Sequence, residues 1–332
     1  MSELSVLGAG SFGTALAIQL ARKDQATHIW ARKAEHIAAL TADRENKQYL
    51  PGCKLPVKLQ PTADLAAAVS AGEHVVVAVP SHAFRATLEA IQPLLREGQG
   101  IACACKGLEP GSGQLPHEVF AEALGDGRPF AVISGPTFAK EIGIGLPTAV
   151  TVAANEQDFA DEIAHAFHGG VFRAYTAQDV VGVEIGGAVK NVLAIGVGIA
   201  DGLGLGANTR AALITRGLAE IMRLGEALGG QRDTLMGLAG MGDLVLTCTD
   251  DQSRNRRMGL ALASGKSVDE ASAEIRQVVE GVRVAPEVLR LARRHKVDMP
   301  ITDQVVRVLS GEAKPVEGVK ALAGRPAKVE AE

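Results

Sequence analysis

The segment "LSVLGAGSFGTALAIQLARK" (residues 4–23) decides the fold of the first half of the chain. An apolar run ends at Gly8, and Gly10 and Gly13 follow before a stretch of helical composition. Glycines at this spacing, between a strand and a helix, allow a tight turn, a close approach to a diphosphate and close helix–strand packing. Free N–H groups at the start of the helix favour an anion there. The segment therefore predicts dinucleotide binding, with a merely structural glycine-rich turn as the alternative.

Short β-rich runs alternate with helical segments from this point to about residue 178. The runs are rich in Val, Ile and Ala without polar alternation, which indicates strands buried on both faces of a parallel sheet. We predict strands at 4–8, 27–31, 74–79, 100–105, 130–134, 148–154 and 171–176, with helical segments between them such as 62–71 and 83–96. Strand–helix alternation predicts an α/β, Rossmann-like, doubly wound domain over residues 1–178.

The strand signal ends near residue 179, and only helical patterns follow. Residues 179–204 predict one long, largely buried helix, and 209–229 predict an amphipathic helix that ends at a glycine. We predict further helices at 254–264, 267–276, 281–295 and 302–310. A second, all-α domain over residues 179–311 is therefore expected, followed by a poorly ordered tail over 312–332 that mixes charge, Gly and Pro.

Composition narrows the class of protein. The 332 residues carry a net charge of −4, which argues against a nucleic-acid partner because phosphate binding needs clustered Lys and Arg. The four cysteines show no framework spacing, which indicates a reducing compartment. No signal-like segment begins the chain, and the most apolar stretch, residues 185–200, contains a lysine and is too short to span a bilayer. We expect a cytoplasmic protein without stable membrane insertion.

The residues after the second predicted strand bear on the choice of coenzyme. NAD enzymes usually place an Asp or Glu there, to bind the ribose 2′-hydroxyl. This chain instead has Arg32 and Lys33, and a guanidinium would pair with a 2′-phosphate in forked geometry. We expect NADP(H), while NAD(H) and a pair of merely solvated cations stay open as alternatives.

Lys190 is the strongest candidate for chemistry, because it lies inside an apolar helix. Burying an ammonium group costs free energy unless the group has a partner or a task. Burial also lowers the pKa of a lysine, and a nearby cation lowers it further, toward a value that suits proton transfer. Asp243, in an otherwise apolar turn, is a candidate to orient this ammonium.

Other polar groups follow the predicted strands at the edge where open α/β sheets bind ligands. Lys106 follows the strand at 100–105, and Gly135 and Thr137 follow the strand at 130–134. The alternative readings are a solvated loop lysine and an ordinary helix that begins at a proline. The run at 253–257 is a candidate phosphate receptor, although such runs are usually solvated; it contains Ser253, Arg254, Asn255, Arg256 and Arg257.

No metal site is expected. His165 and His168 lie at a predicted helix end, where a cation suits the helix dipole. Cys103 and Cys105 point the same way on a strand but have no ligand partners nearby in the sequence.

Eight motifs occur in an order that resembles the bacterial NAD(P)-dependent sn-glycerol-3-phosphate dehydrogenase family. The resemblance runs from about residue 5 to residue 311, and "GMGDLVLTCTDDQSRNRRMG" (240–259) is its most specific part. The other motifs are "GAGSFGTALA" (8–17), "VPSHAF" (79–84), "KGLE" (106–109), "ISGPTFAKEI" (133–142), "GGAVKNVLAIG" (186–196), "GANTRAALITRGLAE" (206–220) and "VVEG" (278–281).

The resemblance implies a role for each matching residue. Lys190 would be the catalytic proton donor and acceptor, with Asp243 beside it. The glycerol phosphate would contact Lys106, Gly135, Thr137, Lys190, Asp243, Ser253, Arg254 and Asn255. The coenzyme would contact Ser11, Phe12, Arg32, Lys106, Ala139, Arg254, Val278 and Glu280. The resemblance also implies a C-terminal domain like that of 6-phosphogluconate dehydrogenase.

The implied reaction is the reversible reduction of dihydroxyacetone phosphate to sn-glycerol 3-phosphate, a precursor of glycerophospholipids. The apolar helical domain is compatible with a homodimer. One alternative is a 2-hydroxy-acid or β-hydroxy-acid dehydrogenase of the same two-domain plan, with His82 as the acid in place of Lys190. Another is a nicotinamide-sensing regulator without catalysis, which would need neither the proton donor nor the phosphate receptor.

Overall fold

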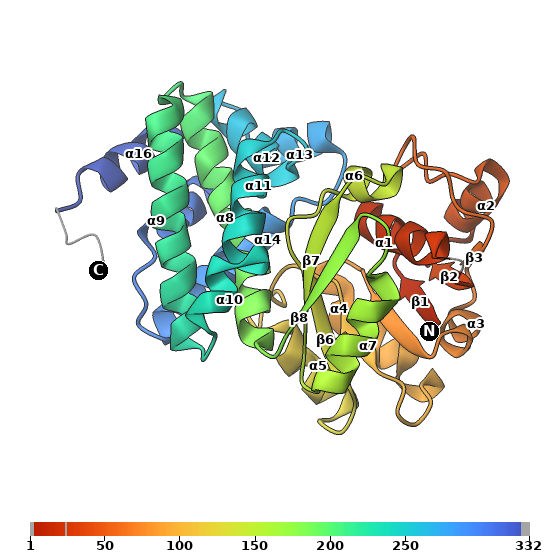
Figure 1. Cartoon of the computed structure of the whole chain (residues 1–332). Helices are drawn as coiled ribbons and strands as arrows, with labels where there is room; N and C mark the ends of the chain where they lie inside the picture. Colours follow the sequence, from red (N-terminus) through yellow and green to blue (C-terminus); the bar gives the residue numbers. More distant parts are fainter. Residues whose placement is uncertain (1–2, 24, 327–332) are drawn as a thin grey trace.

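A mixed sheet with helices on both faces is followed by a bundle of helices (Figure 1). The computed structural model describes residues 3–23 and 25–326, and these residues form an eight-stranded sheet in the order β3-β2-β1-β4-β5-β6-β7-β8. The strands are β1 (Leu4–Leu7), β2 (Thr27–Trp30), β3 (Leu59–Thr62), β4 (His74–Val77), β5 (Ile101–Cys103), β6 (Phe130–Ser134), β7 (Thr148–Ala154) and β8 (Phe172–Ala177). The doubly wound α/β class predicted from the sequence is confirmed.

The sheet departs from the prediction in one strand direction and one extra strand. β7 runs antiparallel to β6, whereas the other neighbouring pairs are parallel. The connection between β6 and β7 holds only the short helix α6 (Ala139–Ile144), and an antiparallel return needs no long crossover. β3 escaped prediction because it contains Pro61, and proline is tolerated in a sheet at an edge strand such as this one.

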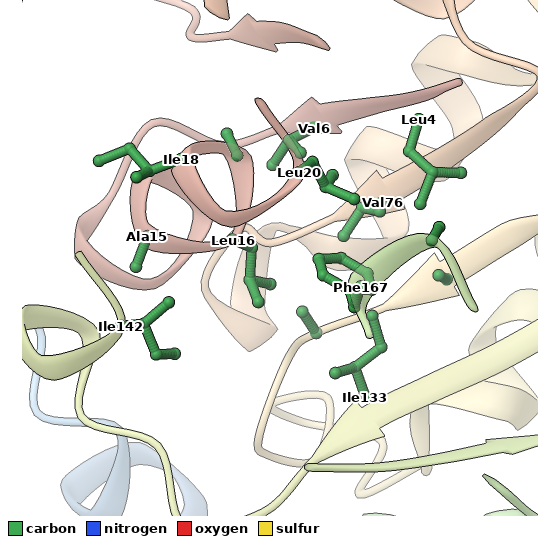
Figure 2. Packing of buried hydrophobic residues seen from close by; sticks show 14 of the residues in the cluster. Leu4, Val6, Ala15, Leu16, Ile18, Leu20, Val76, Ile133, Ile142 and Phe167 are labelled. Carbon is green, nitrogen blue, oxygen red and sulfur yellow. The ribbon is translucent and has the colours of Figure 1, made fainter. Parts of the chain in front are cut away.

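Helices cover both faces of the sheet. Side chains of α1, α6 and α7 pack on one face together with residues of β1, β4 and β6, as Figure 2 shows for Leu16, Val76, Ile133, Ile142 and Phe167. Residues of α3, α4 and α5 pack on the other face. The remaining bounds are α1 (Ser11–Arg22), α2 (Ala34–Asp43), α3 (Leu65–Ala71), η1 (Ser81–Ala83), α4 (Phe84–Ile91), η2 (Gln92–Leu94), α5 (Pro116–Leu124) and α7 (Gln157–Phe167).

Two glycines allow α1 to begin directly against the strand ends. Gly8 has φ +119°, and a Cβ there would lie 2.7 Å from the Ala78 carbonyl oxygen. A Cβ on Gly13 would lie 2.0 Å from the carbonyl oxygen of Gly8. A side chain at either position would therefore push α1 away from β1 and β4.

The helical part is built around α8 (Val180–Gly202), whose residues are almost all buried. The helices predicted over 254–264, 267–276, 281–295 and 302–310 are confirmed with nearly the same bounds. The other elements are α9 (Gly206–Ala227), α10 (Arg232–Met236), η3 (Leu238–Gly242), α11 (Asp243–Thr249), α12 (Arg254–Ala263), α13 (Val268–Ile275), α14 (Glu280–Arg294), α15 (Pro300–Leu309) and α16 (Pro315–Ala323).

α8 packs against both halves of the molecule. Val183 in its first turns joins the core on the sheet, and residues from Ile185 onward form the centre of the helical core. Glu184 accepts hydrogen bonds from the backbone N–H of His117 (2.9 Å) and from its Nδ1 (2.6 Å), at the start of α5. Among the described residues, α8 is the one helix that is long and apolar enough to cross a membrane. However, 83% of its apolar 18-residue segment is buried inside the protein, as in a core helix.

A helix lies where the sequence predicted a poorly ordered tail. α16 begins with Pro315, and the Lys314 N–H donates to the Glu317 carboxylate at 2.7 Å, which caps the helix start. Leu322 packs against the helical core. Capping at its start and packing against α15 and α12 give α16 an order that composition did not reveal. Residues 327–332 of the predicted tail lie outside the described residues.

The surroundings of Gly13 and Gly10 differ, so the same substitution should destabilise the protein at Gly13 and leave its stability unchanged at Gly10. Gly13→Ala is expected to lower the free energy of unfolding by about 2 kcal/mol or more, because the added Cβ overlaps the backbone of Gly8. At Gly10 φ is −78° and a Cβ would meet no described atom within 4 Å, so Gly10→Ala should unfold like the wild type. Urea unfolding followed by circular dichroism measures both. Equal stability of the two variants would contradict the packing argument.

Candidate active site

Lys190 is buried on α8 and held by groups from α11. Its side chain is only 8% exposed, and Nζ lies 2.5 Å from Asp243 Oδ1 and 3.1 Å from Thr247 Oγ1. Asp243 is the first residue of α11 and follows the π-helical turn η3, a kind of local irregularity that is frequent at functional sites. Thr247 lies one turn later and donates to the Asp243 carbonyl at 2.6 Å. Two side chains on one face of α11 therefore orient this lysine.

Lys106 enters the same cluster from the sheet. It follows β5, and its Nζ donates to Asp243 Oδ2 (2.8 Å), to the Gly135 carbonyl (2.9 Å) and to Thr137 Oγ1 (3.0 Å). One carboxylate therefore bridges a lysine of the sheet half and a lysine of the helical half. The structure brings together Lys106, Gly135, Thr137, Lys190 and Asp243, and the cluster of two lysines and one aspartate carries a net positive charge that suits an anion.

The environment tunes Lys190 for proton transfer. The pKa of Lys190 is lowered to about 8 overall: burial is the largest cause, the Asp243 carboxylate opposes it, and the ammonium of Lys106 adds to the lowering. A general acid or base is most efficient when its pKa lies near the working pH. The group can therefore give a proton to, or take one from, an oxygen that reaches the cluster.

A chain of amides extends from this cluster to the start of α14. Asn191 donates to the Lys106 carbonyl (3.1 Å), and its Oδ1 accepts from Asn255 Nδ2 (2.8 Å). Asn255 Oδ1 then accepts from the N–H of Gly281 (2.9 Å). These two hydrogen bonds hold the Asn255 amide in one orientation, next to Asn191, the residue that follows Lys190 on α8.

The run at 253–257 divides into residues that face the site and residues that do not. Ser253 caps α12, where its Oγ accepts from the Arg256 N–H. Arg254 Nη1 donates to the Val278 carbonyl at 2.9 Å, and burial lowers its pKa. Arg256 instead pairs with Asp201 and Asp251, and Arg257 is exposed. Of the five residues in this run, Ser253, Arg254 and Asn255 therefore remain as candidates for a phosphate site.

The glycine-rich turn adjoins the lysine cluster and is open at Gly10, where an added Cβ would meet no described atom within 4 Å. The open space around Gly10 lies at the start of α1, where free N–H groups favour an anion. Ser11 Oγ donates to the Tyr49 carbonyl at 2.6 Å and lies 3.4 Å from Gln277 Oε1. The Phe12 ring centre lies 5.3 Å from Lys106 Nζ, so the turn and the cluster are in direct contact.

The remaining predicted coenzyme residues lie around this turn at different depths. Ala139 begins α6, and Glu280 begins α14 and accepts from Ser81 Oγ at 2.9 Å. Arg32 and Lys33 are exposed directly after β2, and no contact of the described residues joins them to the lysine cluster. His82, the acid of the hydroxy-acid alternative, is exposed on η1 and likewise makes no described contact with Lys190.

Thr247 and Asn191 were missed from the sequence, although a signal existed for each. Thr247 follows Asp243 by four residues, which places both on one helix face. Asn191 is adjacent to Lys190 and is a buried polar residue in the same apolar helix. Ser81, which binds Glu280, had no signal, because nothing in the sequence links two positions so far apart.

Metal ligands do not gather in the part of the chain that the structure describes. Within residues 3–23 and 25–326, no three His, Cys, Asp or Glu side chains are grouped so that they could hold an ion. Cys53, Cys103, Cys105 and Cys248 are buried and unpaired by disulfides.

Comparisons with known proteins place this geometry among glycerol-3-phosphate dehydrogenases. Family models described as the N-terminus and the C-terminus of NAD-dependent glycerol-3-phosphate dehydrogenase match residues 3–160 and 179–320. A protein of Stenotrophomonas maltophilia (strain R551-3) named glycerol-3-phosphate dehydrogenase [NAD(P)+] is 55% identical over 328 residues, which cover 99% of this chain and 96% of the relative. One of Aeromonas salmonicida (strain A449) with the same name is 56% identical over 323 residues, 97% of each.

A solved structure agrees with these relatives. The crystal structure of a glycerol-3-phosphate dehydrogenase from Coxiella burnetii superposes with a TM-score of 0.94 at 46% identity, covering 98% of this chain and 99% of that one.

The shared carboxylate predicts opposite shifts of one pKa in two variants. Lys106→Met should raise the pKa of Lys190 above about 8, because a neighbouring positive charge is removed. Asp243→Asn should lower that pKa, because the stabilising negative charge is lost. NMR titration of protein labelled at the lysine ε-carbons measures both, with Lys190→Arg to assign the signal. Shifts in the same direction would contradict the electrostatic account.

Proposed function

This chain belongs to the NAD-dependent glycerol-3-phosphate dehydrogenase family, and we propose that it reversibly reduces dihydroxyacetone phosphate to sn-glycerol 3-phosphate with Lys190 as proton donor. Members of this family are NAD(P)-dependent oxidoreductases that act on a CH–OH group. The observation that carries the assignment of roles is the bridge of Asp243 between Lys106 and Lys190, next to the glycine-rich turn.

The turn of residues 8–13 fits the diphosphate of a nicotinamide dinucleotide. The open space at Gly10 and the N–H groups that begin α1 suit that anion. When bound, the coenzyme supplies or accepts the hydride. Ser11, Phe12, Ala139, Val278 and Glu280 would hold it between the turn and the start of α14.

Lys190 would manage the proton of the reacting oxygen. During reduction the ketone oxygen gains negative charge, and an ammonium beside it both stabilises that charge and donates a proton. During oxidation the neutral amine takes the proton of the hydroxyl. A pKa of about 8 leaves both forms accessible near neutral pH.

The other members of the cluster would orient the reacting groups. Asp243 and Thr247 hold the Lys190 ammonium in one direction. Lys106, fixed by Gly135 and Thr137, would polarise the same oxygen or bind a hydroxyl of the substrate. Orientation of this kind lowers the barrier because the reactants need not find their geometry by collision.

The start of α12 would bind the substrate phosphate. Arg254 adds a guanidinium, Ser253 an N-terminal cap and Asn255 an oriented amide at the first turn of a ten-residue helix. The phosphate takes no part in the reaction, but the free energy of binding it would hold the ketone in place beside the lysines. We therefore propose that residues 1–178 bind the coenzyme and that residues 179–311 supply the catalytic lysine and the phosphate site.

We also propose a preference for NADP(H). Arg32 and Lys33 are exposed immediately after β2, at the position where an acidic residue would select NAD(H). A guanidinium there is free of the lysine cluster and accessible to a 2′-phosphate.

The cellular setting belongs to the same proposal. The product is a backbone for glycerophospholipids, so we place the enzyme in phospholipid precursor synthesis in the cytoplasm. A homodimer is supported by exposed apolar side chains such as Met236, Met241 and Val245 on the helical half.

The hydroxy-acid alternative is not favoured. Relatives that are 55% identical over nearly the whole chain carry the glycerol-3-phosphate dehydrogenase name, and His82 is exposed and is not among the described hydrogen-bond partners of Lys190. A regulator without catalysis would have no use for the buried lysine cluster. Turnover of dihydroxyacetone phosphate with NADPH or NADH, followed at the nicotinamide absorbance, tests the proposed function directly.

Removing the amino group of Lys190 should stop chemistry but not coenzyme binding. Lys190→Met is expected to lower kcat about 10²- to 10⁴-fold, because the general acid is lost, while the Kd of NADPH changes little. Stopped-flow kinetics and coenzyme titration give the two values. Lys320→Met, on the exposed face of α16, is the matched control and should keep wild-type turnover. Near-normal kcat in Lys190→Met would remove this lysine from the mechanism.

The pH profile gives an independent readout of the same group. At saturating coenzyme, kcat/KM for reduction should fall as pH rises through about 8, since the ammonium form donates the proton. The value for oxidation should rise over the same range. Lys190→Met should show neither inflection.

The proposed preference for NADP(H) depends on Arg32, an exposed side chain that can be removed without a change in the core. Arg32→Ala is expected to raise KM for NADPH roughly tenfold to a hundredfold, because a charge-assisted contact to the 2′-phosphate is lost, and to leave KM for NADH unchanged. Arg294→Ala, an exposed arginine on α14, serves as the control. A wild-type enzyme that uses NADH better than NADPH would contradict the preference.

A further inference from the structure

The topology of the sheet fixes where a crevice for the coenzyme lies. β1 and β4 are neighbours, and the chain continues from β1 to β2 and β3 on one side and from β4 to β5 and β6 on the other. In doubly wound sheets a ligand binds at such a switch point, outside the carboxyl ends of the two strands. Ser11 follows β1 and Ser81 follows β4, so these two serines mark the two sides of the crevice.

The segment 277–280, which leads into α14, reaches both sides of this crevice. At one end Gln277 Oε1 lies 3.4 Å from Ser11 Oγ. At the other end Ser81 Oγ donates to Glu280 Oε2 at 2.9 Å. Figure 1 shows α14 on the side of the bundle that faces the sheet. A short piece of the helical half therefore lies beside the carboxyl ends of β1 and β4.

The backbone of this segment is fixed by the helical half. Val279 is buried in the helical core, and Arg254 on α12 donates to the carbonyl of Val278 at 2.9 Å. Glu280 begins α14, where a carboxylate suits the helix dipole. The backbone is thus held in place, and the direction of the Glu280 side chain is what its hydrogen bond to Ser81 sets.

Ser81 is itself a firmly placed donor. It is buried, and the loop before it is held where Cys105 Sγ donates to the Val79 carbonyl at 3.0 Å. Gly107 packs directly against it, since a Cβ on Gly107 would lie 3.1 Å from Ser81 Oγ. Because Gly107 follows Lys106 in the chain, Ser81 lies where the crevice meets the lysine cluster.

The hydroxyl of Ser81 binds one oxygen of Glu280 and leaves the other. Among the described residues, Ser81 is the one hydrogen-bond donor to this carboxylate. An ionised carboxylate can only accept hydrogen bonds. The ribose hydroxyls and the carboxamide of a nicotinamide dinucleotide are donors of the matching kind.

We propose that Ser81 is a positioning residue for coenzyme binding: its hydroxyl fixes the Glu280 carboxylate so that the second oxygen accepts from the coenzyme. This rests on the proposed function, which places Glu280 among the coenzyme contacts, and it gives Ser81 a task that neither the motif spacing nor the family resemblance implies. Without the hydroxyl, the carboxylate would occupy several rotamers, and binding would cost the entropy of selecting one of them.

Titration of NADPH fluorescence with the full chain measures coenzyme binding without turnover. Ser81→Ala should raise the Kd of NADPH about fivefold, because the carboxylate is no longer held, while kcat at saturating NADPH falls less than about twofold. The lysine cluster keeps its own contacts in this variant. Ser5→Ala is the matched control, since Ser5 is a buried serine of β1 whose hydroxyl has no partner among the described residues. It should bind NADPH like the wild type.

A double-mutant cycle separates positioning from a merely structural role. Glu280→Ala should raise the Kd of NADPH about tenfold, and adding Ser81→Ala to it should change that value less than about twofold, because no carboxylate is left to hold. A further rise of about fivefold in the double variant would show that Ser81 acts without Glu280 and would overturn the proposal. Wild-type affinity for NADPH in either single variant would also overturn it. Reduction of dihydroxyacetone phosphate by the wild type is measured separately, so this proposal can fail while the proposed function stands.

Discussion

The carboxylate of Asp243 is the interaction on which the rest of the site depends. It lies between two ammonium groups that come from different halves of the chain, Lys106 after β5 and Lys190 on α8. Without it Lys190 would be a buried, uncompensated charge beside another cation, which the surrounding apolar helix could not stabilise. The same bridge holds the end of the sheet against α8. One side chain thus serves both the packing of the two halves and the positioning of the proton donor.

Much of the fold could be predicted because its signals are local. The glycine spacing after β1, the apolar strands and the long helix at α8 each lie within one short segment, and the structure has them where they were expected. The antiparallel direction of β7 goes with the short connection after β6, which holds only α6, and the apolar pattern of a strand does not record its direction. β3 was hidden by Pro61, and α16 depends on a cap and a contact with the helical core rather than on composition.

Site residues could be predicted from the sequence where a charged residue lies in an otherwise apolar segment. Lys190 in an apolar helix and Asp243 in an apolar turn stand out because burying charge is costly, and the structure joins them directly. The motif resemblance brought in positions such as Val278 and Glu280, which have no such local signal. Within the basic run at 253–257, Arg256 pairs with Asp201 and Asp251 and supports the bundle. Sequence could not show which of these cations had acidic neighbours.

α8 belongs to two cores at once, since Val183 packs with the sheet whereas the following turns form the centre of the bundle. Glu184 adds a polar link to α5. The join between the halves is therefore a shared helix and not a linker. A chimaera that joined these two halves from different relatives would contain an α8 with one face that does not match the half it packs against. Such a chimaera should be less stable unless the residues of α8 that face the exchanged half are exchanged with it.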